Sequence, residues 1–206
     1  MTIRVRRRGV MLGLLAVAGC GAHGEWRVRY PQALDPAVTR GWHVADVRVS
    51  VPRTLTTSDE NSWTPDYDIV WHGDPPGDRY AQVEALMTTA LRTGAQELRG
   101  KRAVTLVATL QQFHAITPKV EKYLHFSGVH DIRFTLQIFD ARSGQPLTEP
   151  TPIAADAPAL VGGDARAARA RGYTQKNEII DAVSAVMRGY LGIGPDPRHD
   201  FSRLGR

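Results

Sequence analysis

The chain has 206 residues, of which 42% are hydrophobic and 23% charged, so it is long enough for one folded domain with a hydrophobic core. Its formal net charge is +5, but residues 1–19 hold four of the 26 basic residues and none of the 21 acidic ones, which leaves 22 basic against 21 acidic residues. This near-neutral remainder excludes the basic surface typical of nucleic-acid binding, and the single cysteine excludes an internal disulfide.

The first predicted element is an export signal at residues 1–19. Arginines at positions 4 and 6–8 precede an apolar run of eleven residues, 9–19, and the chain turns polar by His23. A membrane-spanning helix needs roughly 20 apolar residues, whereas a basic start followed by a short apolar run is typical of a cleaved signal peptide. The pair Arg7-Arg8 leaves both the general secretory route and the twin-arginine route open.

The signal ends in Val17-Ala18-Gly19-Cys20, which resembles the bacterial lipobox. The resemblance implies cleavage between Gly19 and Cys20, a diacylglycerol on the Cys20 sulfur and often an acyl chain on the new amine. Two or more such chains give a stable membrane anchor. Because Gly21 stands where an aspartate tends to retain lipoproteins of Gram-negative bacteria at the inner membrane, we expect an outer-membrane protein that faces the periplasm.

The mature chain is expected to contain one domain between two irregular segments. Residues 20–41 are predicted to be a lipidated tether, because Pro31 and Pro36 interrupt any periodic pattern. The domain is predicted at 42–192, and residues 193–206 are predicted to be a flexible tail.

Hydrophobic periodicity predicts the elements of this domain in chain order. Valines at 47, 49 and 51 alternate with polar residues, as in a half-buried strand. A long polar loop follows at about 53–77, with a short edge strand at 67–71. Asp78 can cap a helix over 78–100, and Gly94 on its apolar face indicates a close approach by another element. The remaining elements are strands at about 102–114, 130–140 and 147–154, a tight turn at 140–145 and a helix at about 174–191.

The order strand, helix, strand, strand, strand, helix predicts an α+β fold. We expect a two-layer sandwich in which a mostly antiparallel sheet of about four strands carries two amphipathic helices on one face. The other face is predicted to be mixed, with Val107, Phe113 and Phe139 among threonines and glutamines. If two helices cover only one face, this second face is available to a partner or a second copy.

Two short stretches carry a further resemblance. Gly128-Val129-His130-Asp131-Ile132-Arg133-Phe134, followed by Asp140-Ala141-Arg142-Ser143-Gly144, resembles a family of uncharacterised Gram-negative envelope lipoproteins of unknown function. The resemblance covers roughly residues 42–192. It implies a small α+β domain of the cell envelope, and its motifs are tied to no known activity.

A catalytic or metal site is the alternative hypothesis, and it rests on a group of histidines. His114, His125 and His130 could supply three metal ligands if the 115–129 loop folds back, and Asp131 lies beside them. The opposing interpretation is that these are surface or turn histidines, because neighbouring side chains on a strand, such as His130 and Asp131, diverge. We therefore predict no metal and no cofactor, and keep an envelope hydrolase or metal-dependent enzyme near His125, His130 and Asp131 as the alternative.

Four aromatic residues surround the first long loop: Trp63, Tyr67, Trp71 and Tyr80. Aromatic side chains are enriched in interface hot spots, but they can equally plug the end of a sheet beneath a loop, and both interpretations stay open. The sequence thus predicts a non-catalytic lipoprotein with a binding or accessory role in the envelope. Its expected partners are the membrane, through the lipid on Cys20, and an envelope protein, with no small-molecule substrate.

Overall fold

The computed structural model describes residues 25–126 and 128–203. The predicted signal peptide and Cys20 lie outside the described residues, so both stay predictions. Within the described ranges the chain forms nine β-strands, five α-helices and one short 3-10 helix. The strands are β1 (Trp26–Arg29), β2 (Trp42–Ser50), β3 (Thr57–Ser58), β4 (Ile69–Val70), β5 (Arg102–His114), β6 (Gly128–Asp140), β7 (Thr151–Ala155), β8 (Ala157–Ala159) and β9 (Ser202–Arg203). The helices are α1 (Pro36–Thr39), α2 (Arg79–Ala95), α3 (Pro118–Tyr123), α4 (Gly162–Ala170), α5 (Gln175–Tyr190) and the 3-10 helix η1 (Pro197–His199).

The predicted α+β class is confirmed, but the sheet is larger than the four strands expected. The strands follow the order β3-β4-β5-β6-β7-β1-β9, with β2 also paired to β5 and β8 to β6. The two longest strands, β5 and β6, are antiparallel, as are the pairs on the β6–β7–β1–β9 side. On the other edge of β5, both β2 and β4 run parallel to it. Helix α2 forms the crossover between β2 and β5, and such a crossover is what joins parallel strands.

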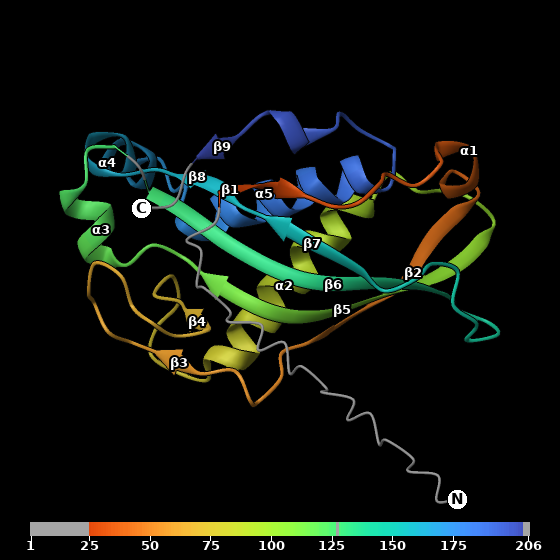
Figure 1. Ribbon diagram of the computed structural model, residues 1–206, viewed down its shortest axis with the longest axis horizontal. Coiled ribbons are helices and arrows are strands. Elements are labelled where there is room, and N and C mark those ends of the chain that lie inside the picture. The colour runs from red at the N-terminus through yellow and green to blue at the C-terminus, as the bar shows by residue number, and fades with distance from the viewer. Residues whose placement is uncertain (1–24, 127, 204–206) are drawn as a thin grey trace, which may run out of the picture.

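Two helices cover one face of this sheet. Figure 1 shows α2 and α5 on the same side of strands β5, β6 and β7. The sequence predicted both helices, and the side chains of β5 and β6 that alternate toward them form the core. No helix of the described residues covers the opposite side, which we call the open face. The fully buried core residues of the two central strands are Val104, Leu106, Ala108, Leu110, Phe113, Ile132, Phe134, Leu136 and Ile138.

One strand residue lies on the opposite side from the one predicted. Phe113 was expected on the open face with Val107, but it is fully buried in the core. The reason is a register shift between Leu110 and Gln112, where β5 has one residue more than its partner β6. An extra residue of this kind inverts the alternation that follows it. Gln112 and His114 therefore take the open-face positions at the end of β5, whereas Val107 and Phe139 are half-buried as expected.

Part of the predicted tether and of the predicted tail belongs to the fold. Strand β1 pairs with β7 on one side and with β9 on the other. Val28 and Tyr30 are buried, and the Tyr30 hydroxyl donates a hydrogen bond of 2.7 Å to Asp196. The alternation in Trp26–Arg29 is a short strand pattern, and Pro36 opens helix α1, a position where proline is well tolerated. Strands β1 and β9, at the two ends of the described chain, thus belong to the sheet.

The close approach predicted at Gly94 occurs between α2 and α5. A Cβ atom at this position would lie 2.6 Å from the Met187 Cβ and 2.7 Å from the Ser184 carbonyl oxygen. The Ser184 hydroxyl also donates to the Ala90 carbonyl at 2.9 Å, which holds the two helices at this distance. Glycine is therefore required by packing, against its low helix propensity.

We expect Gly94→Ala to lower the free energy of unfolding by about 1–3 kcal/mol, because the added methyl must push the helices apart. Chemical denaturation measures the change. Gly163→Ala is the matched control, since a Cβ atom there meets only the end of the Arg166 side chain at 3.8 Å. Alanine at Gly163 should be neutral or slightly stabilising. Equal stability of Gly94→Ala and the wild type would contradict the packing explanation.

Candidate functional site

The four aromatic residues around the first loop separate into two pairs. Trp71 is fully buried, packs edge-on against Phe113 at a centroid distance of 5.7 Å, and donates its indole N–H to Asp74 at 2.9 Å. The Tyr80 hydroxyl donates to the Leu55 carbonyl at 2.6 Å. These two residues stabilise the loop and the end of the sheet, as the plug interpretation expects.

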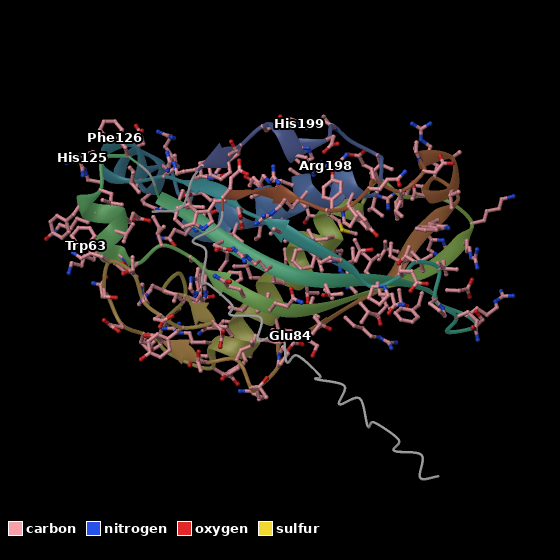
Figure 2. All side chains as sticks on the ribbon, viewed as in Figure 1. Trp63, Glu84, His125, Phe126, Arg198 and His199 are labelled. Atoms are coloured by element: carbon pink, nitrogen blue, oxygen red, sulfur yellow. The ribbon has the colours of Figure 1, made fainter. Side chains whose placement is uncertain are left out.

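Trp63 and Tyr67 are instead exposed, by 48% and 39%. Two neighbours that the sequence analysis did not single out, Tyr123 and Phe126, are exposed by 57% and 82%. Figure 2 places Trp63 and Phe126 at the same end of the molecule. We call Trp63, Tyr123 and Phe126 the aromatic tip. In the sequence, Thr117 followed by Pro118 indicates the start of helix α3, which carries Tyr123, because a capping residue before proline is typical of a helix start.

Two hydrogen bonds hold the loop that carries Trp63 against helix α3. The Thr117 hydroxyl donates to the Ser62 carbonyl at 2.8 Å, and the backbone N–H of Lys119 donates to the Asn61 side chain at 2.7 Å. As a result the rings of Trp63 and Tyr123 lie 6.5 Å apart. The exposed rings are thus presented in a defined arrangement by elements far apart in sequence.

An apolar pocket of about 390 Å³ lies behind the tip. Its few polar side chains are engaged by the protein itself. The His114 ring nitrogen Nε2 pairs with the Tyr67 carbonyl oxygen, and Asp131 accepts hydrogen bonds from Trp26, Gln112 and Arg133 at 2.9–3.2 Å. The lining residues are Trp26, Trp63, Thr64, Pro65, Val70, His114, Ala115, Ile116, Thr117, Val120, Leu124, Gly128, Val129 and Asp131.

A buried carboxyl pair adjoins this pocket. Asp156 is 1% exposed, and its Oδ2 accepts a hydrogen bond of 3.0 Å from the backbone N–H of Arg27. Burial and the neighbouring Asp131 carboxylate raise the pKa of Asp156 to about 7. The protonated form of Asp156 can donate to Asp131, whereas its carboxylate would be repelled by Asp131.

His125, His130 and Asp131 are not brought together. His130 is fully buried on the helix side of β6, where its Nε2 lies 3.3 Å from the Glu178 carboxylate. Asp131, the next residue on the strand, points to the other side, and His125 is exposed in the loop after α3. In residues 25–126 and 128–203 no three His, Cys, Asp or Glu side chains are grouped as a metal site would require.

His130 instead belongs to a structural ion network. Glu178 accepts hydrogen bonds from Arg169 at 2.6 Å and from the Leu160 backbone N–H at 2.9 Å, and Arg169 also pairs with Glu121 at 2.5 Å. Burial alone would raise the pKa of Glu178, but the hydrogen bonds from His130, Leu160 and Arg169 outweigh it and lower this pKa. The network joins α3, α4 and α5 to β6 and thereby fixes the end of the molecule that carries the aromatic tip.

The open face carries a second hollow, with a volume of about 460 Å³. Register places Arg29 on β1 and Arg133 on β6 opposite the same residue of β7, the small Ala154, so the two arginines flank a low point of the sheet. Arg133 is paired with Asp131 at 2.9 Å, and Arg27 lies 3.4 Å from Glu25. The lining residues are Arg27, Arg29, Tyr30, Pro31, Gln111, Arg133, Pro152, Ile153 and Ala154.

Comparison with family models places the chain in one family of unknown function. The model of a family of unknown function, DUF6778, matches residues 42–206. Comparison with curated proteins gives no match. Within the described ranges, no helix combines the length and apolarity needed to cross a bilayer.

Several solved structures match this chain over most of their length. One is a protein from Xanthomonas campestris of the family DUF330, 13% identical, which covers 81% of this chain and 91% of its own, with a TM-score of 0.43. Another is the PelC dodecamer from Paraburkholderia phytofirmans, which is 12% identical. That match covers 81% of this chain and 97% of the other, with a TM-score of 0.35. A third is a minor lipoprotein from Acinetobacter baumannii, which is 14% identical. That match covers 71% of this chain and 92% of the other, with a TM-score of 0.27. At these identities and TM-scores the likeness assigns no function.

Proposed function

The chain belongs to DUF6778, a family of unknown function, and we propose that it is a lipoprotein anchored through Cys20 to the periplasmic face of the outer membrane. We propose further that its role there is non-catalytic and consists of binding another envelope protein. The lipobox-like sequence around Cys20 supports the anchor. The observation that supports binding is that helices α2 and α5 cover only one face of the sheet (Figure 1).

The open face has the features of a protein-binding surface. The helices of the described residues leave it uncovered, and its hollow is walled by Arg29 and Arg133 with the apolar Ala154 between them. Arginine is enriched at interfaces because its planar guanidinium forms paired hydrogen bonds with carboxylates. The partner surface that fits best is therefore acidic, with electrostatic attraction that favours its approach.

The pockets support binding over catalysis. A catalytic acid, base or nucleophile must be able to reach a substrate atom. In the pocket behind the aromatic tip, His114 and Asp131 are held by hydrogen bonds within the chain. The alternative of an envelope hydrolase near His125, His130 and Asp131 gains no shared cleft, because these three side chains point to different regions.

Photo-crosslinking in living cells tests this function. We expect a photoreactive residue at Gln111, on the open face, to capture one envelope protein, and the same residue at Glu84, exposed on helix α2, to capture none. Arg29→Glu should reduce the crosslinked product at least about tenfold through charge repulsion. Arg92→Glu makes the same charge change on α2 and should leave the product unchanged. Equal products from both positions, or from neither, would reject the open face as the partner surface.

A further inference from the structure

We propose that the aromatic tip is a membrane seat, which rests on the lipid headgroups of the membrane that holds the Cys20 anchor. This inference rests on the proposed function, because it assumes an acyl chain on Cys20. It adds an orientation to that function. The tip faces the bilayer, and the open face remains accessible to a periplasmic partner.

The distribution of exposed apolar side chains supports the seat. Among the described residues, five large hydrophobic side chains are prominently exposed, and three of them form the tip. Tyr67 follows Trp63 in the same loop, and Val38 on α1 lies at the opposite end of the molecule (Figure 1). Tryptophan and tyrosine are the residues that prefer the boundary between lipid and water, because their rings are apolar and carry one polar group.

Two lysines lie among these rings. The ammonium group of Lys119 is 4.9 Å from the Trp63 ring centroid, and that of Lys122 is 4.8 Å from the Tyr123 ring centroid. Cations beside interfacial aromatic rings can reach lipid phosphates while their methylene stems stay in apolar contact. Asp66 is also exposed in this loop, so the rings and not the net charge must supply most of the affinity.

The path of the chain brings the anchor to the same end. Trp26, the first residue of β1, lines the same pocket as Trp63. Cys20 precedes Trp26 by six residues, and six residues of fully extended chain span at most about 20 Å. An acyl chain on Cys20 therefore keeps this end of the domain within about 20 Å of the bilayer. At that distance exposed rings gain by contact with lipid, since the anchor has already removed most of the translational freedom.

A single fluorescent label tests the seat. Cys20 is the only cysteine of the natural chain, so a cysteine introduced by Phe126→Cys can be labelled alone once Cys20 is acylated. The label is a polarity-sensitive dye, and the lipidated full chain is reconstituted into vesicles of phosphatidylethanolamine and phosphatidylglycerol. We expect the emission to shift to the blue and most of the quenching by aqueous iodide to be lost. The control is Val38→Cys, whose label should remain in water.

The possible results separate the two proposals. A chain that floats with vesicles while the labels at positions 126 and 38 stay equally accessible to iodide keeps its anchor and has no seat. A chain that does not float with vesicles lacks the anchor, and both proposals fall. In cells, a photoreactive residue in place of Tyr123 should crosslink to phospholipid. A single protein product at that position would overturn the seat and make the tip a protein-docking surface.

Discussion

Cys20→Ser is expected to move the protein from the membrane fraction to the soluble fraction of the periplasm or to leave it with an uncleaved signal. Serine has no thiolate to accept the diacylglycerol, and the lipobox peptidase requires the modified cysteine in the processing that the resemblance implies. The anchor contributes about 0.8 kcal/mol for each buried methylene, so any chain that is cleaved without the lipid should leave the membrane almost completely. Cell fractionation and the mass of the mature N-terminal peptide measure both effects.

A second substitution tests the choice of membrane separately from the lipid anchor. Gly21→Asp keeps Cys20 and its lipid, and we expect this variant to remain membrane-bound but to sediment with the inner membrane. Because only the residue after the lipidated cysteine changes, acylation should be unaffected.

A Cys20→Ser variant that still fractionates with membranes, at normal mature mass, would show that Cys20 is not the anchor.

Asp156→Asn is expected to stabilise the protein at neutral pH and to have little effect in acid. The folded-state pKa of about 7 lies above the ordinary value of 3.8, so the folded chain holds a proton that the unfolded chain has lost between these values. Stability from this group is therefore full below pH 3.8, is lost as the pH rises through about 7, and does not change further above that. At about 1.36 kcal/mol for each unit of pKa difference, the decline is at most about 4 kcal/mol.

Asparagine reproduces the protonated form at every pH, because its amide can donate to Asp131 where the carboxylate would be repelled. The difference in unfolding free energy between Asp156→Asn and the wild type should therefore grow from pH 4 to pH 8, as measured by denaturation across that range. Asp66→Asn removes a charge from an exposed loop and should show no such growth. Parallel stability curves for Asp156→Asn and the wild type would mean that Asp156 is ionised in the folded protein at neutral pH.

Much of the central architecture could be predicted from local pattern. The helical periodicity ahead of Gly100 and the alternation in β6 gave α2 and β6 to within a few residues, because each buries one face. The turn after Asp140 was also predicted, and Gly144 adopts there the positive φ of 72° that glycine tolerates. These features depend on contacts within a few residues along the chain.

Other features depended on partners far away in sequence. Strand β1 has only four residues, and it is a strand because β7 and β9 pair with it. The bulge between Leu110 and Gln112 depends on how β5 pairs with β6, and it places Phe113 in the core. Periodicity assumes a regular strand, so it could not show this inversion.

The candidate site shows the same division. The sequence by itself predicts the signal and the lipobox resemblance at Cys20, and it predicted the main helices and long strands of the core, since these predictions depend on residue type and spacing alone. Only the tertiary structure decided which aromatic residues are buried and which form the tip. Trp71 and Trp63 are eight residues apart in one loop, yet one packs on Phe113 and the other lies against α3 in solvent. The burial of a loop side chain is decided by the elements that pack against it, and those come from distant parts of the chain.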